Sequence, residues 1–112
     1  MIFNCELIQN KKEKIIKVFG VIKYENLYEV ERVFRDAVHS FQDNLIIDLS
    51  DLEYYDSSFM SLLIEIRMQM DKSQRNLILT GLPDRFLNFI RIAELDQYFI
   101  IWEKKTKHSQ AE

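Results

Sequence analysis

The sequence is poor in glycine, proline and cysteine, with two, one and one of these residues in 112. So little glycine and proline excludes a linker-rich or low-complexity chain and indicates a compact, ordered protein. A lone cysteine, Cys5, cannot form a disulfide within the chain, and two scattered glycines exclude a glycine-rich phosphate-binding loop. The N-terminus also lacks the basic region and apolar core of a secretory signal, so we expect a cytoplasmic protein.

Long hydrophobic runs and an excess of one charge are missing as well. The apolar stretches fall far short of the roughly 20 residues that span a bilayer. The formal net charge is −3, and acidic and basic residues are mixed along the chain. No extended positive surface that would attract nucleic acid is therefore expected. The sequence predicts neither membrane insertion nor direct nucleic-acid binding.

The chain does contain enough apolar residues to form one hydrophobic core. Hydrophobic residues make up 47% of the sequence, and a chain of this length forms a single domain. Residues 2–9 and 15–22 are rich in β-branched and apolar side chains, and the polar stretch between them suits a hairpin loop. We expect the domain to cover residues 1–103 and a flexible polar tail to cover 104–112.

Three segments are predicted to be helical. The first begins after Asn26, which with Glu29 predicts an N-cap and its capping pair. Its apolar residues lie on one helical stripe: Leu27, Val30, Phe34, Ala37, Val38 and Phe41. The second helix is expected from near Ser57 to about Asp71, and the third is expected to start at Pro83.

Continuous apolar runs at 44–50 and 76–81 are typical of central strands that are covered on both faces. Residues 97–103 indicate a final strand. Because helices alternate with these strands, the connections must be crossovers. The sequence therefore predicts an α/β domain, with a mixed, mainly parallel sheet of four or five strands, an N-terminal hairpin and about three helices packed against the sheet.

The junction between the 44–50 strand and the second helix, Asp56-Ser57-Ser58, is the candidate site. Helix N-termini with free N–H groups converge at the carboxyl ends of central strands. In the ordinary interpretation Asp56 or Ser57 caps the helix and contributes on the order of 1 kcal/mol. In the functional interpretation a serine is phosphorylated, which adds about −1.5 to −2 charge units where the helix dipole favours them. A partner docked on the neutral loop would then lose affinity.

These segments resemble the STAS domains, named for sulphate transporters and anti-sigma factor antagonists, and in particular the small stand-alone antagonists. The resemblance covers nearly the whole chain, and its most specific element is "IIDLSDL" followed at a fixed distance by "DSS". It implies that Ser58 is phosphorylated by an anti-sigma factor that is also a serine kinase. It further implies that only the unphosphorylated protein binds this kinase, and that a phosphoserine phosphatase reverses the modification. We expect a monomer or a weak dimer.

The predicted partner-binding surface consists of Lys23, Tyr55, Asp56, Ser57, Ser58, Phe59 and Met60. Two of these residues depart from the family pattern. Phe59 stands where a glycine usually follows the serines, and a bulky ring there would alter how closely a partner approaches. Lys23 stands where many antagonists carry an aspartate. If it lies beside the loop, its ammonium could pair with Asp56.

These departures keep a second function open. In this alternative the protein is a STAS scaffold or sensor that binds a protein or small ligand through the same loop, without phosphorylation. The adjacent tyrosines, Tyr54 and Tyr55, are expected to point in opposite directions, one into the core and one outward as a binding hot spot.

The second helix carries more apolar residues than a sheet alone would cover. One set is expected to face the sheet: Phe59, Leu62, Leu63, Ile66 and Met70. A second stripe, Met60, Ile64 and Met68, is expected to pack against the helix that starts at Pro83. A partner-docking groove is the alternative for this stripe.

Enzymatic and metal-binding functions are disfavoured. A hydrolytic triad of one of the serines with His39 and Asp48 lacks a glycine-flanked nucleophile turn, and nothing places His39 near the serines. A magnesium site at Asp48, Asp51 and Asp56 lacks an acidic pair after the first strand. Asp48 is better explained as a residue near the end of its strand whose carboxylate binds backbone donors. We therefore expect no catalytic residues, no cofactor and no metal.

Overall fold

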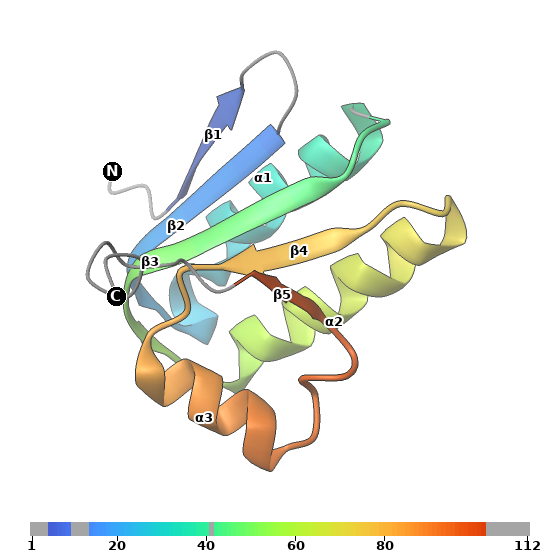
Figure 1. Cartoon of the computed structure of the whole chain (residues 1–112). Helices are drawn as coiled ribbons and strands as arrows, with labels where there is room; N and C mark the ends of the chain where they lie inside the picture. The colour runs from blue at the N-terminus through green and yellow to red at the C-terminus, as the bar shows by residue number, and fades with distance from the viewer. Residues whose placement is uncertain (1–4, 10–13, 41, 103–112) are drawn as a thin grey trace, which may run out of the picture.

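The computed structural model describes residues 5–9, 14–40 and 42–102. In chain order the elements are β1 (Cys5–Gln9), β2 (Lys14–Ile22), the 3-10 helix η1 (Tyr24–Asn26), α1 (Leu27–Ser40), β3 (Leu45–Tyr55), α2 (Ser57–Lys72), β4 (Leu77–Thr80), α3 (Asp84–Ile92) and β5 (Ile100–Trp102). Figure 1 shows α1 and α2 against the sheet and α3 near the end at which β3 and β4 finish. The predicted order of strands and helices is confirmed.

Within the described residues the sheet has the strand order β1-β2-β3-β4-β5. β1 pairs antiparallel with β2, as a hairpin must, and the pairs β2–β3, β3–β4 and β4–β5 are parallel. Each parallel pair is joined through a helix, because the chain must cross back to the end of the sheet at which the previous strand began. The prediction of a mixed, mainly parallel sheet with an N-terminal hairpin is confirmed.

β3 is longer than the sequence predicted, since it runs past Ser50 to Tyr55. Its first four residues pair with the whole of β4, whereas its last residue pairs with Ile22 at the end of β2. Because β4 ends early, the second half of β3 has a paired neighbour on one side only. Residues 45–49 are mostly buried, as a strand covered on both faces should be, whereas residues 50–55 are mostly exposed and lead to the candidate site.

The main core lies between the sheet and the helices α1 and α2. The predicted stripe on α1 is buried at Val30, Phe34, Ala37 and Val38. Phe41 of that stripe lies outside the described residues. On α2 the residues predicted to face the sheet are all buried: Phe59, Leu62, Leu63, Ile66 and Met70. The apolar periodicity of both helices thus identified their buried faces correctly.

The second apolar stripe of α2 is only partly covered. Met60 is buried and Ile64 packs against the core, but Met68 is 51% exposed. Met60 lines a hollow that α3 also lines, whereas Met68 stays exposed, so the third helix does not cover the stripe as a whole. α3 has nine residues, about 13 Å at 1.5 Å per residue, so it is too short to accompany the whole of α2.

The start of α1 differs from the prediction that Asn26 is its N-cap. A 3-10 turn, η1, precedes the helix, and Asn26 is its last residue. The Asn26 side chain points back along the chain: its Oδ1 accepts the Lys23 N–H at 2.7 Å, and its Nδ2 donates to the Val21 carbonyl at 2.7 Å. The predicted capping pair with Glu29 is therefore wrong, because the Asn26 amide is used to hold the turn that leads from β2 into the helix.

The sheet face away from the main core carries a row of isoleucines in register across every strand of the sheet, namely Ile8, Ile15, Ile46, Ile78 and Ile100. Neighbouring β-branched side chains on one face favour this register. β5 is shorter than the predicted 97–103 strand, and the predicted tail at 104–112 lies outside the described residues.

Candidate functional site

Asp56 is the N-cap of α2 and connects three parts of the chain. Its backbone is extended, and its Oδ1 accepts the Ser58 N–H at 3.0 Å. The Ser58 hydroxyl donates to the same oxygen. Asp56 Oδ2 accepts the Tyr24 N–H at 2.9 Å. The predicted capping role belongs to Asp56 rather than Ser57, and the same carboxylate ties the first turn of α2 to η1.

These hydrogen bonds keep the Asp56 carboxylate charged. They lower the pKa of Asp56, and the largest cause is the Ser58 hydroxyl, followed by the backbone N–H groups of Tyr24, Ser58 and Phe59. Donors of this kind favour the anionic form of an acid. The loop therefore carries a fixed negative charge in direct contact with the Ser58 hydroxyl.

Replacing Asp56 with alanine is expected to lower the free energy of unfolding at pH 7 by about 1–2 kcal/mol, because the helix loses its cap and Tyr24 its acceptor. Since folding lowers the pKa of Asp56, the contribution is fully present above the ordinary pKa near 4 and is lost as the pH falls through the lowered value. Urea unfolding at pH 7 and pH 2 measures both effects.

The matched control is Asp71→Ala, at the exposed far end of the same helix. It is expected to change stability by less than about 0.5 kcal/mol at either pH. A difference between wild type and Asp56→Ala that stays the same down to pH 2 would contradict the role given to the carboxylate.

The two serines occupy the first turn of α2 with different exposure. Ser57 is exposed, whereas Ser58 is partly covered and its hydroxyl is held by Asp56. A phosphate on Ser58 would lie beside the charged Asp56 carboxylate, in the first turn of a helix whose dipole favours anions. The structure thus brings together the three residues of the predicted Asp-Ser-Ser site.

Phe59 and Met60, which were also predicted to contact a partner, face inward. Phe59 is fully buried, with its ring centroid 6.4 Å from that of Phe34 and 6.3 Å from that of Phe86. The prediction of direct partner contact is wrong for Phe59, because the first turn of α2 already lies over the core. Its ring therefore does not obstruct the loop. Met60 is buried but lines a surface hollow with α3.

Lys23 lies beside the site, but its ammonium does not make the predicted pair with Asp56. Its Nζ lies 5.7 Å from the centroid of the Tyr54 ring, the geometry of a cation–π contact. Among the ion pairs of the described ranges none involves Lys23. Asp56 instead uses the neighbouring Tyr24 N–H, so the backbone after Lys23 supplies the contact that its side chain was expected to supply.

Tyr54 and Tyr55 point in opposite directions, as predicted. Tyr54 is 46% exposed, whereas Tyr55 packs with its ring centroid 4.5 Å from that of Phe86 and 6.3 Å from that of Phe89. Burial raises the pKa of the Tyr55 hydroxyl. Tyr54 is therefore the more accessible of the pair, whereas Tyr55 packs against α3.

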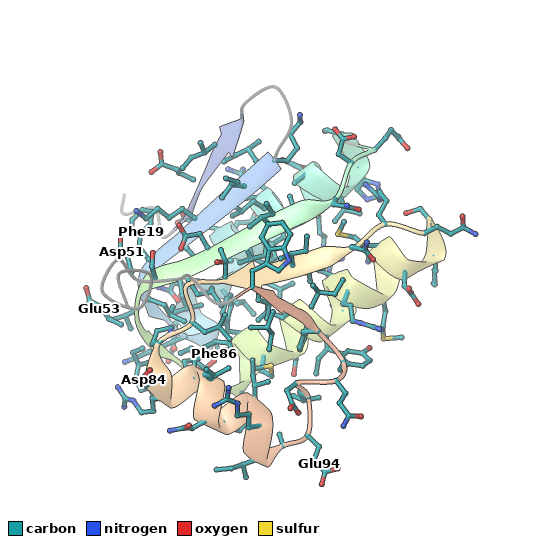
Figure 2. The ribbon with its side chains drawn as sticks, in the orientation of Figure 1. Phe19, Asp51, Glu53, Asp84, Phe86 and Glu94 are labelled. Atoms are coloured by element: carbon teal, nitrogen blue, oxygen red, sulfur yellow. The ribbon has the colours of Figure 1, made fainter. Side chains whose placement is uncertain are left out.

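The contribution of α3 to this site was not predicted from the sequence. A hollow of about 240 Å³ lies between the end of β3, the start of α2 and α3. It is lined by Leu52, Glu53, Tyr54, Tyr55, Asp56, Ser57, Met60, Pro83, Arg85, Phe86 and Phe89. Figure 2 shows Glu53, Asp84 and Phe86 at this end of the molecule. The sequence did contain one signal for this contribution, namely two phenylalanines three residues apart on the predicted third helix, Phe86 and Phe89.

The disfavoured catalytic and metal sites are not assembled. His39 lies in the last turn of α1, roughly 18 Å along the helix from the end that contacts the site. Asp48 Oδ1 accepts the backbone N–H of Ser50 at 3.0 Å, as expected, and also the Ser50 hydroxyl at 2.7 Å. The expected position near the strand end is wrong, because β3 continues to Tyr55. No group of three His, Cys, Asp or Glu side chains in the described part of the chain is placed to hold a metal ion.

Within the same described ranges no helix is long and apolar enough to cross a membrane. The fold and the site together define a small α/β domain in which an Asp-Ser-Ser segment starts the helix after the central strand. The chain matches the family model described as "Mlab, STAS domain" over residues 5–102, and it belongs to the STAS family. The resemblance deduced from the sequence is thereby confirmed.

Solved structures with this fold include anti-sigma factor antagonists. An antagonist STAS domain protein from Planctomyces limnophilus has a TM-score of 0.80 at 16% identity, covering 96% of both chains. The phosphorylated form of SpoIIAA from Bacillus has a TM-score of 0.70 at 14% identity, also covering 96% of both chains. A serine-to-glutamate variant of RsbS from Moorella thermoacetica has a TM-score of 0.71 at 17% identity, covering 97% of this chain and 94% of the other.

Proposed function

We propose that the protein is an anti-sigma factor antagonist that works by partner switching. It binds an anti-sigma factor with serine kinase activity while Ser58 is unphosphorylated, and it releases this partner when Ser58 carries a phosphate. A phosphoserine phosphatase restores the binding form, and the cycle takes place in the cytoplasm. The similarity in fold to solved antagonists supports this role.

The observation that carries the proposal is the hydrogen bond from the Ser58 hydroxyl to Asp56. Phosphorylation replaces the proton of this hydroxyl with a group of about −1.5 to −2 charge units. A favourable contact with the Asp56 carboxylate then becomes a repulsive one. The change is concentrated at one loop, so it alters the docking surface while leaving the buried core in place.

Two effects separate the partner from the modified loop. The added charge must be desolvated before a partner can cover it, and any carboxylate that the partner places beside the loop is repelled. The unmodified loop has neither cost. Affinity therefore depends on the state of a single side chain, as a partner switch requires.

Phosphotransfer to serine variants tests this function. The anti-sigma serine kinase of the same host is incubated with ATP and the wild-type, Ser57→Ala or Ser58→Ala protein, and the modified peptide is mapped by mass spectrometry. We expect one phosphate on wild type and on Ser57→Ala, and none on Ser58→Ala. Phosphate on Ser57, or equal labelling of Ser58→Ala, contradicts the assignment.

A further inference from the structure

The hollow beside the phosphorylation loop has a buried apolar floor and an exposed aromatic rim. Leu52, Met60 and Phe86 form the floor, and all three are buried. Tyr54 and Phe89 form the rim, where they are 46% and 42% exposed. Aromatic side chains around a water-accessible apolar recess are typical of the centre of a protein–protein interface.

The size of the hollow favours a side chain over a free ligand. Its volume is about 240 Å³, whereas small-molecule sites are usually about 300–1,000 Å³ and enclose most of their ligand. Asp56 and Ser57 belong to its wall. A group that occupies the hollow therefore lies next to Ser58. Its affinity changes with the charge that phosphorylation adds.

Two cations flank the hollow. Arg85 lines it, and Lys23, outside the lining, has its Nζ 5.7 Å from the ring centroid of the lining residue Tyr54. Neither takes part in an ion pair among the described residues. Of the nearby carboxylates, Asp56 already accepts hydrogen bonds from Tyr24 and Ser58. The exposed Glu53 on the wall and the exposed Asp84 next to Arg85 in the chain are opposing charges.

We propose that the partner inserts an apolar side chain into this hollow and places an aspartate or glutamate beside it, within reach of Arg85 and Lys23. The proposal rests on the proposed function, because it specifies how the same partner docks. It also gives release a physical cause: a phosphate on Ser58 repels the partner's carboxylate and puts a hydrated charge at the mouth of the hollow.

Matched variants on the exposed surface test the docking mode by calorimetric titration against the anti-sigma serine kinase. Phe89→Ala is expected to weaken binding about tenfold or more, and Arg85→Gln about three- to tenfold. The controls are Ile92→Ala, from the 82% exposed residue on the same helix, and Lys72→Gln, at the far end of α2. Both controls are expected to stay within about twofold of wild type.

Methionine labelling reports on the hollow within the complex. With ¹³C-labelled methionine methyl groups, the Met60 signal is expected to shift when the kinase is added to the unphosphorylated protein. The Met68 signal is expected to stay in place, because Met68 lies about 12 Å further along α2. No shift is expected on adding the kinase to the Ser58-phosphorylated protein.

The outcomes separate this inference from the proposed function. Affinities of Phe89→Ala and Arg85→Gln equal to that of wild type, with an unmoved Met60 signal, overturn the docking mode but leave the phosphoswitch intact. Failure of the unmodified wild-type protein to bind the kinase overturns the proposed function, and this inference with it.

Discussion

Replacing Phe59 with alanine is expected to lower the free energy of unfolding by about 3–5 kcal/mol. The ring is fully buried and packs edge-on against Phe34 and Phe86, so its removal leaves a cavity where α1, α2 and α3 meet. The expected loss is a large part of the roughly 5–15 kcal/mol that stabilises a typical domain. Urea unfolding followed by circular dichroism measures it.

Met68→Ala is the matched control on the same helix. Met68 is 51% exposed, so the substitution is expected to cost about 0.5 kcal/mol or less. A loss below about 1 kcal/mol for Phe59→Ala would contradict the buried position of the ring. It would also restore the interpretation that this residue, where the family usually has glycine, acts on the partner surface.

Replacing Ser58 with aspartate is expected to weaken binding of the anti-sigma serine kinase roughly 100-fold. The substitution places a second carboxylate next to that of Asp56 and removes the hydroxyl that Asp56 accepts. An unfavourable charge at a docking surface costs several kcal/mol, and about 1.4 kcal/mol corresponds to each factor of ten. Isothermal titration with the unphosphorylated wild type as reference measures the change.

Ser58→Ala separates charge from the loss of the hydroxyl. It also removes the hydrogen bond to Asp56, but it adds no charge, so its affinity is expected to stay within a few-fold of wild type. If Ser58→Asp binds as tightly as Ser58→Ala, the switch is absent. The alternative of a STAS scaffold that uses the same loop without phosphorylation would then be the better account.

The elements could be predicted from the sequence because periodicity reports burial directly. The apolar stripes of α1 and α2 mark the helix faces that pack on the sheet, and the continuous apolar runs mark the buried parts of β3 and β4. The cap at Asp56 also followed from local chemistry. That Asn26 does not cap α1 could not be predicted in this way, because its side-chain amide turns back to bind Lys23 and Val21.

The candidate site was predictable only in its contiguous part. The Asp-Ser-Ser segment is local, but the hollow combines Tyr54 at the end of β3 with Phe89 on α3, and no short-range pattern joins them. The inward direction of Phe59 likewise depends on how α2 lies over the core. Neither the length of β3 nor the contact between Lys23 and Tyr54 follows from one segment alone, since each depends on strand pairing.

The phosphorylation state of the protein recovered from its native host is the decisive test of the proposed switch at Ser58. Peptide mass spectrometry locates the phosphate, and the proteins that co-purify with the modified and unmodified forms are identified separately. We expect phosphate on Ser58 and enrichment of a serine kinase of the anti-sigma class on the unmodified form only. A protein that stays unmodified at Ser58 under every growth condition, while still holding a stable partner, would rule out the proposed switch.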